Sequence, residues 1–172
     1  MLRKTKTRME KTKDKKHLNI VGSAGEYFVA AELSQRGIIA TLTLKNTPRI
    51  DVIATNLLNG TVANLQVKTM SIDNNAGWRM GETDEADSKI KNHYYVLVNL
   101  HGLGQLPEYI VIPQPKLSKF LKEDYKNWIS GKKKDGTDRK LTPMRVFDPY
   151  RKKHIMEFAK EYINNWEVLG LW

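Results

Sequence analysis

The sequence predicts an α/β (α+β) domain in which a central mixed β-sheet is flanked by helices. Apolar runs rich in β-branched residues are mixed with segments of helical period. Their order along the chain is a helix, three strands, a variable connection, two strands and then helices, which is typical of a layered domain. A chain of 172 residues suits one hydrophobic core. We therefore expect a basic, flexible tail over residues 1–17 and a single domain over residues 18–172.

The first helix is expected over residues 24–36. Ser23 can cap its amino end, Glu26 stands three residues later as the reciprocal acid of a capping box, and Gly37 offers a left-handed stop. Glu26 also belongs to a helical face that reads Glu26, Val29, Ala30 and Leu33. The acid therefore has two interpretations, a capping residue only or the polar end of an apolar stripe.

The remaining elements follow from apolar runs and turn residues. A strand is expected over 38–44, a hairpin over 48–70 and two further strands over 92–100 and 107–113. Pro115 opens a helix with the apolar stripe Leu117, Phe120, Leu121 and Trp128, and a last amphipathic helix uses Ile155, Phe158, Ala159, Tyr162 and Trp166. Residues 71–91, with four clustered acids, form the variable connection, and residues 131–153 an exposed basic loop.

The hairpin is interrupted by polar residues. Asn59-Gly60 predicts a two-residue type I′ turn, which places Asp51 opposite Lys68 and Ile53 opposite Gln66. Because side chains alternate along a strand, Asp51, Gln66 and Lys68 share one face, and Val52, Ala54, Leu65 and Val67 share the other. Opposed side chains lie about 5 Å apart, so the three polar groups can reach one ion or phosphate.

The helical stripe would add a second acid to this face. If the stripe packs on the polar side of the hairpin, Glu26 comes near Asp51, and a divalent cation between two acids relieves their repulsion. The plainer alternative is that Asp51 and Lys68 form an exposed cross-strand ion pair, worth less than about 1 kcal/mol.

The charge of the chain is concentrated in two segments. The formal net charge is +10, and residues 1–17 and 131–153 each carry +6, so the remaining residues carry −2. Two basic extensions on a near-neutral body favour a polyanion partner, because phosphate contacts release condensed counterions. A solvated tail and a solubilising loop are the alternative.

Several classes of protein are excluded by composition. The absence of cysteine excludes disulfides and thiolate zinc sites, and the four histidines, at 17, 93, 101 and 154, lack the spacing of a helical zinc site. Hard oxygen ligands remain for any metal. There is no apolar run long enough to span a membrane and no signal peptide. We therefore expect a soluble, cytoplasmic protein with no membrane partner.

Three short motifs resemble the PD-(D/E)XK nuclease superfamily, which has the restriction endonuclease-like fold. They are GSAGEYFVAAELSQRG, PRIDVIA and ANLQVKT, which together cover roughly residues 22–69. The resemblance implies that Glu26 is an accessory acid, Asp51 the principal metal ligand, Gln66 the occupant of a position usually held by Glu or Asp, and Lys68 the catalytic lysine. It also implies Mg²⁺ or Mn²⁺ as cofactor, held by Asp51, Gln66 and the Val67 backbone carbonyl, with Glu26 as an accessory ligand. The neutral Gln66 departs from the commonest pattern and weakens divalent binding.

The leading functional prediction is a Mg²⁺-dependent endonuclease that hydrolyses DNA phosphodiester bonds. The phosphate backbone would be held by basic residues of the two charged segments: Lys4, Lys6, Arg8, Lys132, Lys133, Lys134, Arg139 and Lys140. Two alternatives stay open, a catalytically inactive DNA-binding module of the same fold and a basic structural or interaction protein. A junction-resolving member of the family would be a homodimer, and the sequence does not choose among restriction, repair and recombination.

Overall fold

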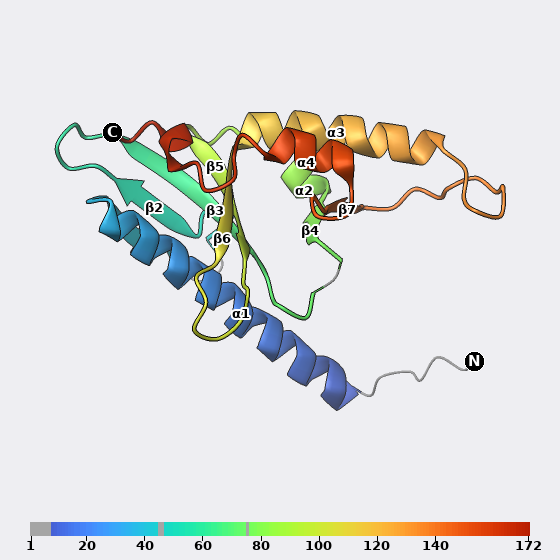
Figure 1. Cartoon of the computed structure of the whole chain (residues 1–172), viewed down its shortest axis with the longest axis horizontal. Helices are drawn as coiled ribbons and strands as arrows, with labels where there is room; N and C mark the ends of the chain where they lie inside the picture. The colour runs from blue at the N-terminus through green and yellow to red at the C-terminus, as the bar shows by residue number, and fades with distance from the viewer. Residues whose placement is uncertain (1–7, 45–46, 75) are drawn as a thin grey trace.

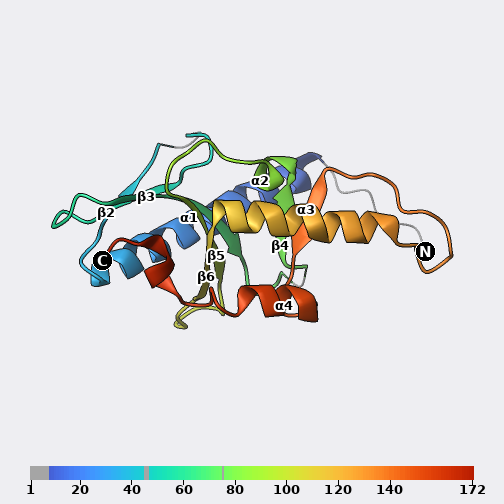
Figure 2. The same ribbon diagram turned by 90° about the horizontal axis from the view of Figure 1, so that it is seen from above.

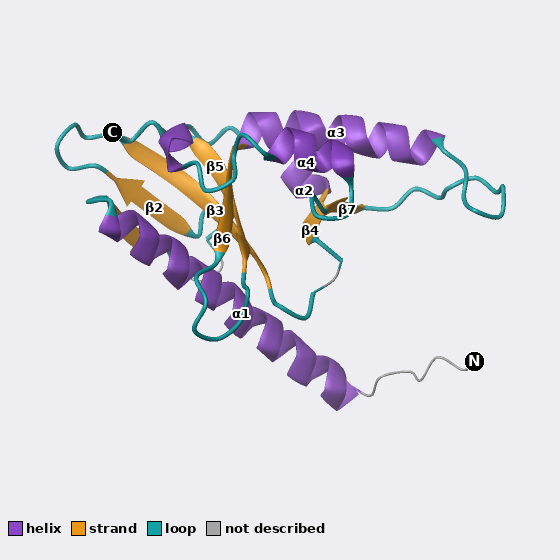
Figure 3. Cartoon of the chain, in the orientation of Figure 1, coloured by secondary structure: helices purple, strands orange, loops and turns teal. Residues whose placement is uncertain are grey.

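The computed structural model describes residues 8–44, 47–74 and 76–172, with side chains from residue 18 onward. Figure 1 shows the arrangement of the elements and Figure 3 their types. In chain order the elements are α1 (Arg8–Gln35), β1 (Ile39–Leu42), β2 (Val52–Thr55), β3 (Val62–Met70), β4 (Trp78–Gly81), α2 (Glu82–Glu85), β5 (His93–Asn99), β6 (Glu108–Pro113), α3 (Gln114–Ser130), β7 (Met144–Phe147), α4 (Lys153–Ala159) and the 3₁₀ helix η1 (Trp166–Leu169).

The central sheet has five strands in the order β1-β2-β3-β5-β6. β3 and β5 are parallel, and the other neighbours are antiparallel, so the sheet is mixed. β4 and β7 form a separate antiparallel pair. The expected mixed sheet flanked by helices is therefore present. Within the described residues, none of the helices combines the length and apolarity that crossing a membrane requires.

The two faces of the sheet carry separate hydrophobic cores. On one face, Val29 and Leu33 of α1 pack with η1 and with the apolar side of the β2–β3 hairpin. On the other face, α3, α4 and the β4–β7 pair enclose a second core around Leu97 and Phe147. α1 and α3 lie on opposite sides of the sheet (Figure 1). Each side chain of β3 therefore faces either α1 or the second core.

Helix α1 begins earlier than the sequence predicts. It starts at Arg8, so Ser23 lies inside the helix and is not its amino-terminal cap, and the capping-box interpretation of Glu26 is wrong. The helix also includes residues 8–17, which were assigned to the flexible tail, whereas residues 1–7 lie outside the described part of the chain. The predicted stop is confirmed: Gly37 has φ +76°, and the Ile38 N–H bonds the Leu33 carbonyl over 3.1 Å.

The hairpin turn differs from the predicted two-residue turn. The strands end at Thr55 and Val62, and within the described residues Gly60 has positive φ (+72°) but Asn59 does not, so the turn is not type I′. The longer loop is held by the carboxyl end of the chain, because the Leu171 carbonyl accepts hydrogen bonds from Asn56 (2.7 Å) and Asn59 (3.1 Å).

The second half of the chain contains two strands that were not expected. β4 lies in the variable connection and β7 lies inside the predicted basic loop 131–153, so that segment is a loop only over residues 131–143 and 148–152. The last helix is shorter than expected, because α4 ends at Ala159. Trp128, assigned to an apolar stripe, is 37% exposed at the far end of α3.

Seen from above, the molecule has two distinct ends (Figure 2). α3 extends past the sheet and leads into the 131–143 segment at one end. The carboxyl terminus lies at the other end, where the Trp172 indole N–H bonds the Arg36 carbonyl at the end of α1 over 3.4 Å. The basic segment after α3 is therefore far from the terminus that closes the hairpin.

Candidate active site

The β2–β3 hairpin brings together two of the polar residues singled out in the sequence. Val52 lies opposite Leu65, so Asp51 lies opposite Gln66. The Gln66 side-chain amide donates a hydrogen bond to Asp51 Oδ2, and the Val67 N–H donates to the same oxygen over 2.7 Å. The Asp51 carboxylate is therefore held against β3 by two donors.

The predicted register is wrong by two residues, since Asp51 lies opposite Gln66 and not Lys68. A shift of two keeps each side chain on its face, because alternation along a strand has a period of two. Lys68 therefore shares the face of Asp51 and Gln66. In the parallel ladder Gln66 and Lys68 lie beside Tyr95 and Leu97, which belong to the second core. The polar cluster is thus on the face opposite α1.

Asp84 of α2 is the partner of Lys68. The Lys68 Nζ lies 3.1 Å from Oδ1 and 3.2 Å from Oδ2 of Asp84. The same carboxylate accepts hydrogen bonds from the Tyr95 hydroxyl (2.9 Å) and the Gly81 N–H (2.7 Å). Asp84 is only 6% exposed, so the Lys68 ammonium is oriented by a carboxylate that is itself held in place. Sequence reasoning missed Asp84 because the acids of residues 71–91 follow no helical or strand period.

The electrostatics of the cluster follow from burial. Burial raises the pKa of Asp51 above its ordinary 3.8, and the Val67 N–H, the Lys68 charge and the Gln66 amide offset this only in part. Burial, followed by the charge of Asp84, raises the pKa of Tyr95 far above its ordinary value, so its hydroxyl keeps its proton and donates. A cation placed beside Asp51 would favour the ionised carboxylate that burial disfavours.

Glu26 does not join this cluster by the expected route. Val29 and Leu33, the apolar residues of its stripe, pack on the apolar face of the hairpin, so α1 covers the face opposite Asp51. α1 comes close to β3 at Gly25, where an added Cβ would lie 1.9 Å from the Thr69 Oγ1. Glu26, half-buried, follows Gly25 in α1. The role of Glu26 as an accessory acid therefore stays a prediction.

Val67 takes part through its backbone. Its N–H points toward Asp51. In an antiparallel ladder the N–H and C=O of one strand residue point to the same neighbour, so the Val67 carbonyl also faces the edge where Asp51 lies. The predicted ligand atom is on the correct side of β3.

Arg49 and His93 lie beside the cluster, and sequence reasoning did not single them out. Arg49 has φ +64°, which a residue with a side chain rarely adopts, and its carbonyl lies 2.9 Å from His93 Nε2. The buried Arg49 Nε and His93 Nδ1 have no hydrogen-bond partner among the described residues. The Arg49 guanidinium also lies close enough to Tyr95 to lower the pKa of its hydroxyl in part. Arg49 thus places an incompletely paired cation two residues before Asp51.

A surface pocket of about 350 Å³ opens at Lys68. It lies at the carboxyl end of β3, where residues of α1 and β4 also reach, and is lined by Leu18, Val21, Lys68, Thr69, Ser71, Asn74, Trp78 and Arg79. Two of these residues, Lys68 and Arg79, are cationic. A phosphate in this pocket would therefore lie near two cations, Lys68 and Arg79.

The predicted DNA-contacting residues can be placed only in part. Lys4 and Lys6 lie outside the described residues, and so does the side chain of Arg8. In the segment after α3, Lys133, Lys134 and Lys140 are exposed. Lys132 pairs with Asp138, and Arg139 donates to the Trp128 carbonyl. All four lysines of this segment are therefore exposed, and one of them, Lys132, is paired with an acid.

No family model, curated protein or solved structure matches this chain. The chemistry of the cluster therefore depends on the groups that its own residues provide. Within the described ranges, no three His, Cys, Asp or Glu side chains gather closely enough to hold a metal by themselves. A divalent ion here would use Asp51 together with the Gln66 and Val67 oxygens, water and a bound phosphate.

Proposed function

We propose that the protein is a metal-dependent endonuclease that hydrolyses DNA phosphodiester bonds. The observation that carries the proposal is the β2–β3 hairpin, which holds Asp51 against Gln66 and has Lys68 on the same face. Lys68 also lines an open pocket. The resemblance to the PD-(D/E)XK superfamily implies these residues, together with Glu26 as an accessory acid. A restriction endonuclease-like core is part of the same proposal.

The oxygen donors fit Mg²⁺ or Mn²⁺. Both hydrogen bonds that described residues donate to Asp51 reach Oδ2, and Oδ1 accepts neither of them. Gln66 gives its amide N–H to Asp51, which leaves its carbonyl oxygen for other contacts. Mg²⁺ is usually held by one or two carboxylates, with waters and substrate phosphates completing the shell. When bound, the ion would lower the pKa of a coordinated water and neutralise charge on the phosphate.

The chain's own residues orient the substrate. Asp84 and Tyr95 hold the Lys68 side chain, so its ammonium can donate to a non-bridging phosphate oxygen in the pocket. Arg79, which lines the same pocket, supplies a second cation for the phosphate. The Val67 N–H keeps Asp51 oriented toward the position where charge develops.

A catalytically inactive DNA-binding module is the second candidate. One observation favours it: Lys68 is already paired with Asp84, and Gln66 with Asp51, so the cluster is a closed network without a ligand. In that case the basic segment after α3 would bind DNA and the cluster would only stabilise the hairpin.

The test is cleavage of plasmid, linear duplex, single-stranded and branched DNA with Mn²⁺, Mg²⁺ or a chelator. We expect metal-dependent cutting that falls about 100-fold or more in Lys68→Ala. Lys122→Ala is the matched control, because Lys122 also pairs with an aspartate, Asp87, but lies on the surface of α3. DNA that is bound but not cut in any metal would favour the binding module. Cutting by Lys68→Ala at the rate of the natural protein would show that this cluster is not the active site.

A further inference from the structure

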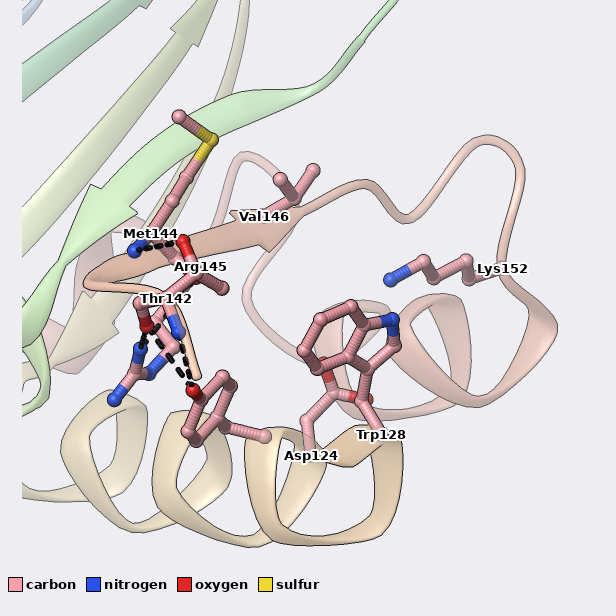
Figure 4. A pocket seen from close by; sticks show the side chains of 8 residues that line it. Asp124, Trp128, Thr142, Met144, Arg145, Val146 and Lys152 are labelled. Atoms are coloured by element: carbon pink, nitrogen blue, oxygen red, sulfur yellow. Dashed lines mark hydrogen bonds between the residues drawn. The ribbon is translucent and has the colours of Figure 1, made fainter. Parts of the chain in front are cut away.

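A second pocket lies between α3 and β7, built from none of the residues of the Asp51 cluster. Its volume is about 190 Å³, and its walls are mainly apolar and aromatic, with Tyr125 and Trp128 of α3 facing Val146 of β7. Figure 4 shows Trp128 projecting from α3, with Val146 on the strand across from it and the Lys152 side chain reaching over from the next loop. The pocket is therefore a slot between an indole and a strand, with a cation at its rim.

The aromatic wall of this pocket is held rigidly. The rings of Tyr125 and Trp128 stack with centroids 5.7 Å apart and an interplanar angle of 22°. The Arg145 guanidinium lies 3.4 Å from the Tyr125 centroid, and Arg139 lies 5.0 Å from the Trp128 centroid. Arg145 is fixed in turn by its ion pair with Glu85. A ligand that stacks here does not have to order the aromatic residues first, which lowers the entropic cost of binding.

The surroundings of the pocket are cationic. Lys152 lines it, and the segment that carries the exposed Lys133, Lys134 and Lys140 begins one residue after α3 ends. Residues 131–153 carry a net charge of +6. The acid in the pocket, Asp124, lies 2.7 Å from the His154 Nε2, with which it pairs when that ring is protonated. An aromatic slot in a basic surface is complementary to a flat base attached to a charged backbone.

We propose that this pocket binds an unpaired base of a DNA strand, packed against the indole of Trp128, while Lys152 and the lysines after α3 contact the flanking phosphates. The proposal rests on the proposed function in taking DNA as the partner, and it narrows the substrate class to DNA with a single-stranded segment. Every base has a π-face, so the pocket accepts bases with little sequence preference. Duplex DNA buries its bases in the stack and would use only the phosphate contacts.

The test compares two oligomers of equal length, oligo-dT and an abasic deoxyribose-phosphate backbone, at one salt concentration. We expect Trp128→Ala to weaken oligo-dT binding by about 10-fold or more and to leave the abasic oligomer unaffected, because only the first offers a base. Trp128→Phe should keep most of the affinity. Trp172→Ala is the matched control, since Trp172 is also exposed (46%) but lies at the other end of the molecule.

Two further variants test the pocket without changing Trp128. Val146→Phe fills the slot without removing the aromatic wall, so it should weaken oligo-dT binding even if Trp128→Ala fails to fold. Lys152→Ala should weaken both oligomers alike. Unchanged oligo-dT binding in Trp128→Ala and Val146→Phe, or equal losses on both oligomers, would overturn the base site.

The test of the base site can fail or succeed independently of the test of the proposed nuclease activity. Asp51→Ala should leave oligo-dT binding intact, because the pocket contains none of the residues of the Asp51 cluster. Base-dependent binding without cleavage would support the base site and contradict the proposed nuclease activity. Cleavage without base-dependent binding would support the nuclease activity and contradict the base site.

Discussion

Asp51 combines two features that oppose each other. Its carboxylate accepts hydrogen bonds from Gln66 and Val67, which favours the ionised form, but burial disfavours that form more strongly. A buried carboxylate whose pKa is raised lowers the stability of the fold at neutral pH, and such groups are common at functional sites, where they can bind a cation. This is the residue at which stability and the proposed function conflict most directly.

Asp51→Asn should therefore stabilise the protein at pH 7. Asparagine keeps an oxygen for the Val67 N–H but carries no charge to desolvate. Because the folded pKa of Asp51 is above the unfolded 3.8, the penalty is full above the folded pKa and is lost as the pH falls toward 3.8. Thermal unfolding at pH 7 and pH 4 measures this: the variant should melt higher at pH 7, with a smaller difference at pH 4. A lower melting temperature at pH 7 would mean that the carboxylate stabilises the fold.

At the scale of elements, the close approach of α1 to β3 depends on one glycine. An added Cβ at Gly25 would lie 1.9 Å from Oγ1 and 3.0 Å from Cβ of Thr69, so no rotamer of that threonine avoids it. Thr69 is the neighbour of Lys68 in β3. The position of the helix over the strand is therefore set by the absence of a side chain.

Gly25→Ala and Gly22→Ala form a matched pair. Both replace a glycine inside α1, which in isolation favours the helix by about 1 kcal/mol. Gly22 has nothing within 4 Å of its added Cβ, so Gly22→Ala should raise the free energy of unfolding by about 0.5–1 kcal/mol. Gly25→Ala should lower it by about 1–3 kcal/mol through overpacking, with partial rescue by Thr69→Ala. Denaturant unfolding measures both, and equal effects would contradict the close packing.

The same elements show what local sequence can and cannot determine. The sharing of one face by Asp51, Gln66 and Lys68 was predictable, because a two-residue error in register does not change the face. The turn was not predictable, because its loop is held by the carbonyl of Leu171, more than one hundred residues away. The Ser23–Glu26 pattern was misleading, since the helix continues through it to Arg8.

The missed parts of the site share one cause. Asp84 becomes a partner of Lys68 only after the short strand β4 pairs with β7, across more than sixty residues. Four-residue strands of this kind carry too little alternation to predict. Trp128 was expected in the apolar stripe of this helix, but α3 extends past the sheet, so its last turn has no layer to cover it. The positions of these residues are set by contacts between distant parts of the chain and not by local propensity.

At the scale of the whole molecule, the location of the positive charges should matter more for DNA binding than the net charge. Replacing Lys133, Lys134 and Lys140 by Gln should flatten the dependence of DNA affinity on salt by about 0.9 in log–log slope for each phosphate that is no longer neutralised. The control replaces three exposed lysines elsewhere, Lys89, Lys91 and Lys160, and changes the net charge equally. Binding measured from low to moderate salt separates the two triple variants. Identical slopes would mean that the segment after α3 only adds solubility.

The cleavage rate of DNA in Mn²⁺ by Asp51→Asn tests the central claim most directly. Thermal unfolding reports independently whether this variant is folded, and Asp73→Asn, the same change at an exposed position, is its control. The account predicts that Asp51→Asn loses cleavage by about 100-fold or more while DNA binding stays within a few fold, and that Asp73→Asn cuts normally. Cleavage by Asp51→Asn at the natural rate would contradict the claim that the β2–β3 cluster is the active site.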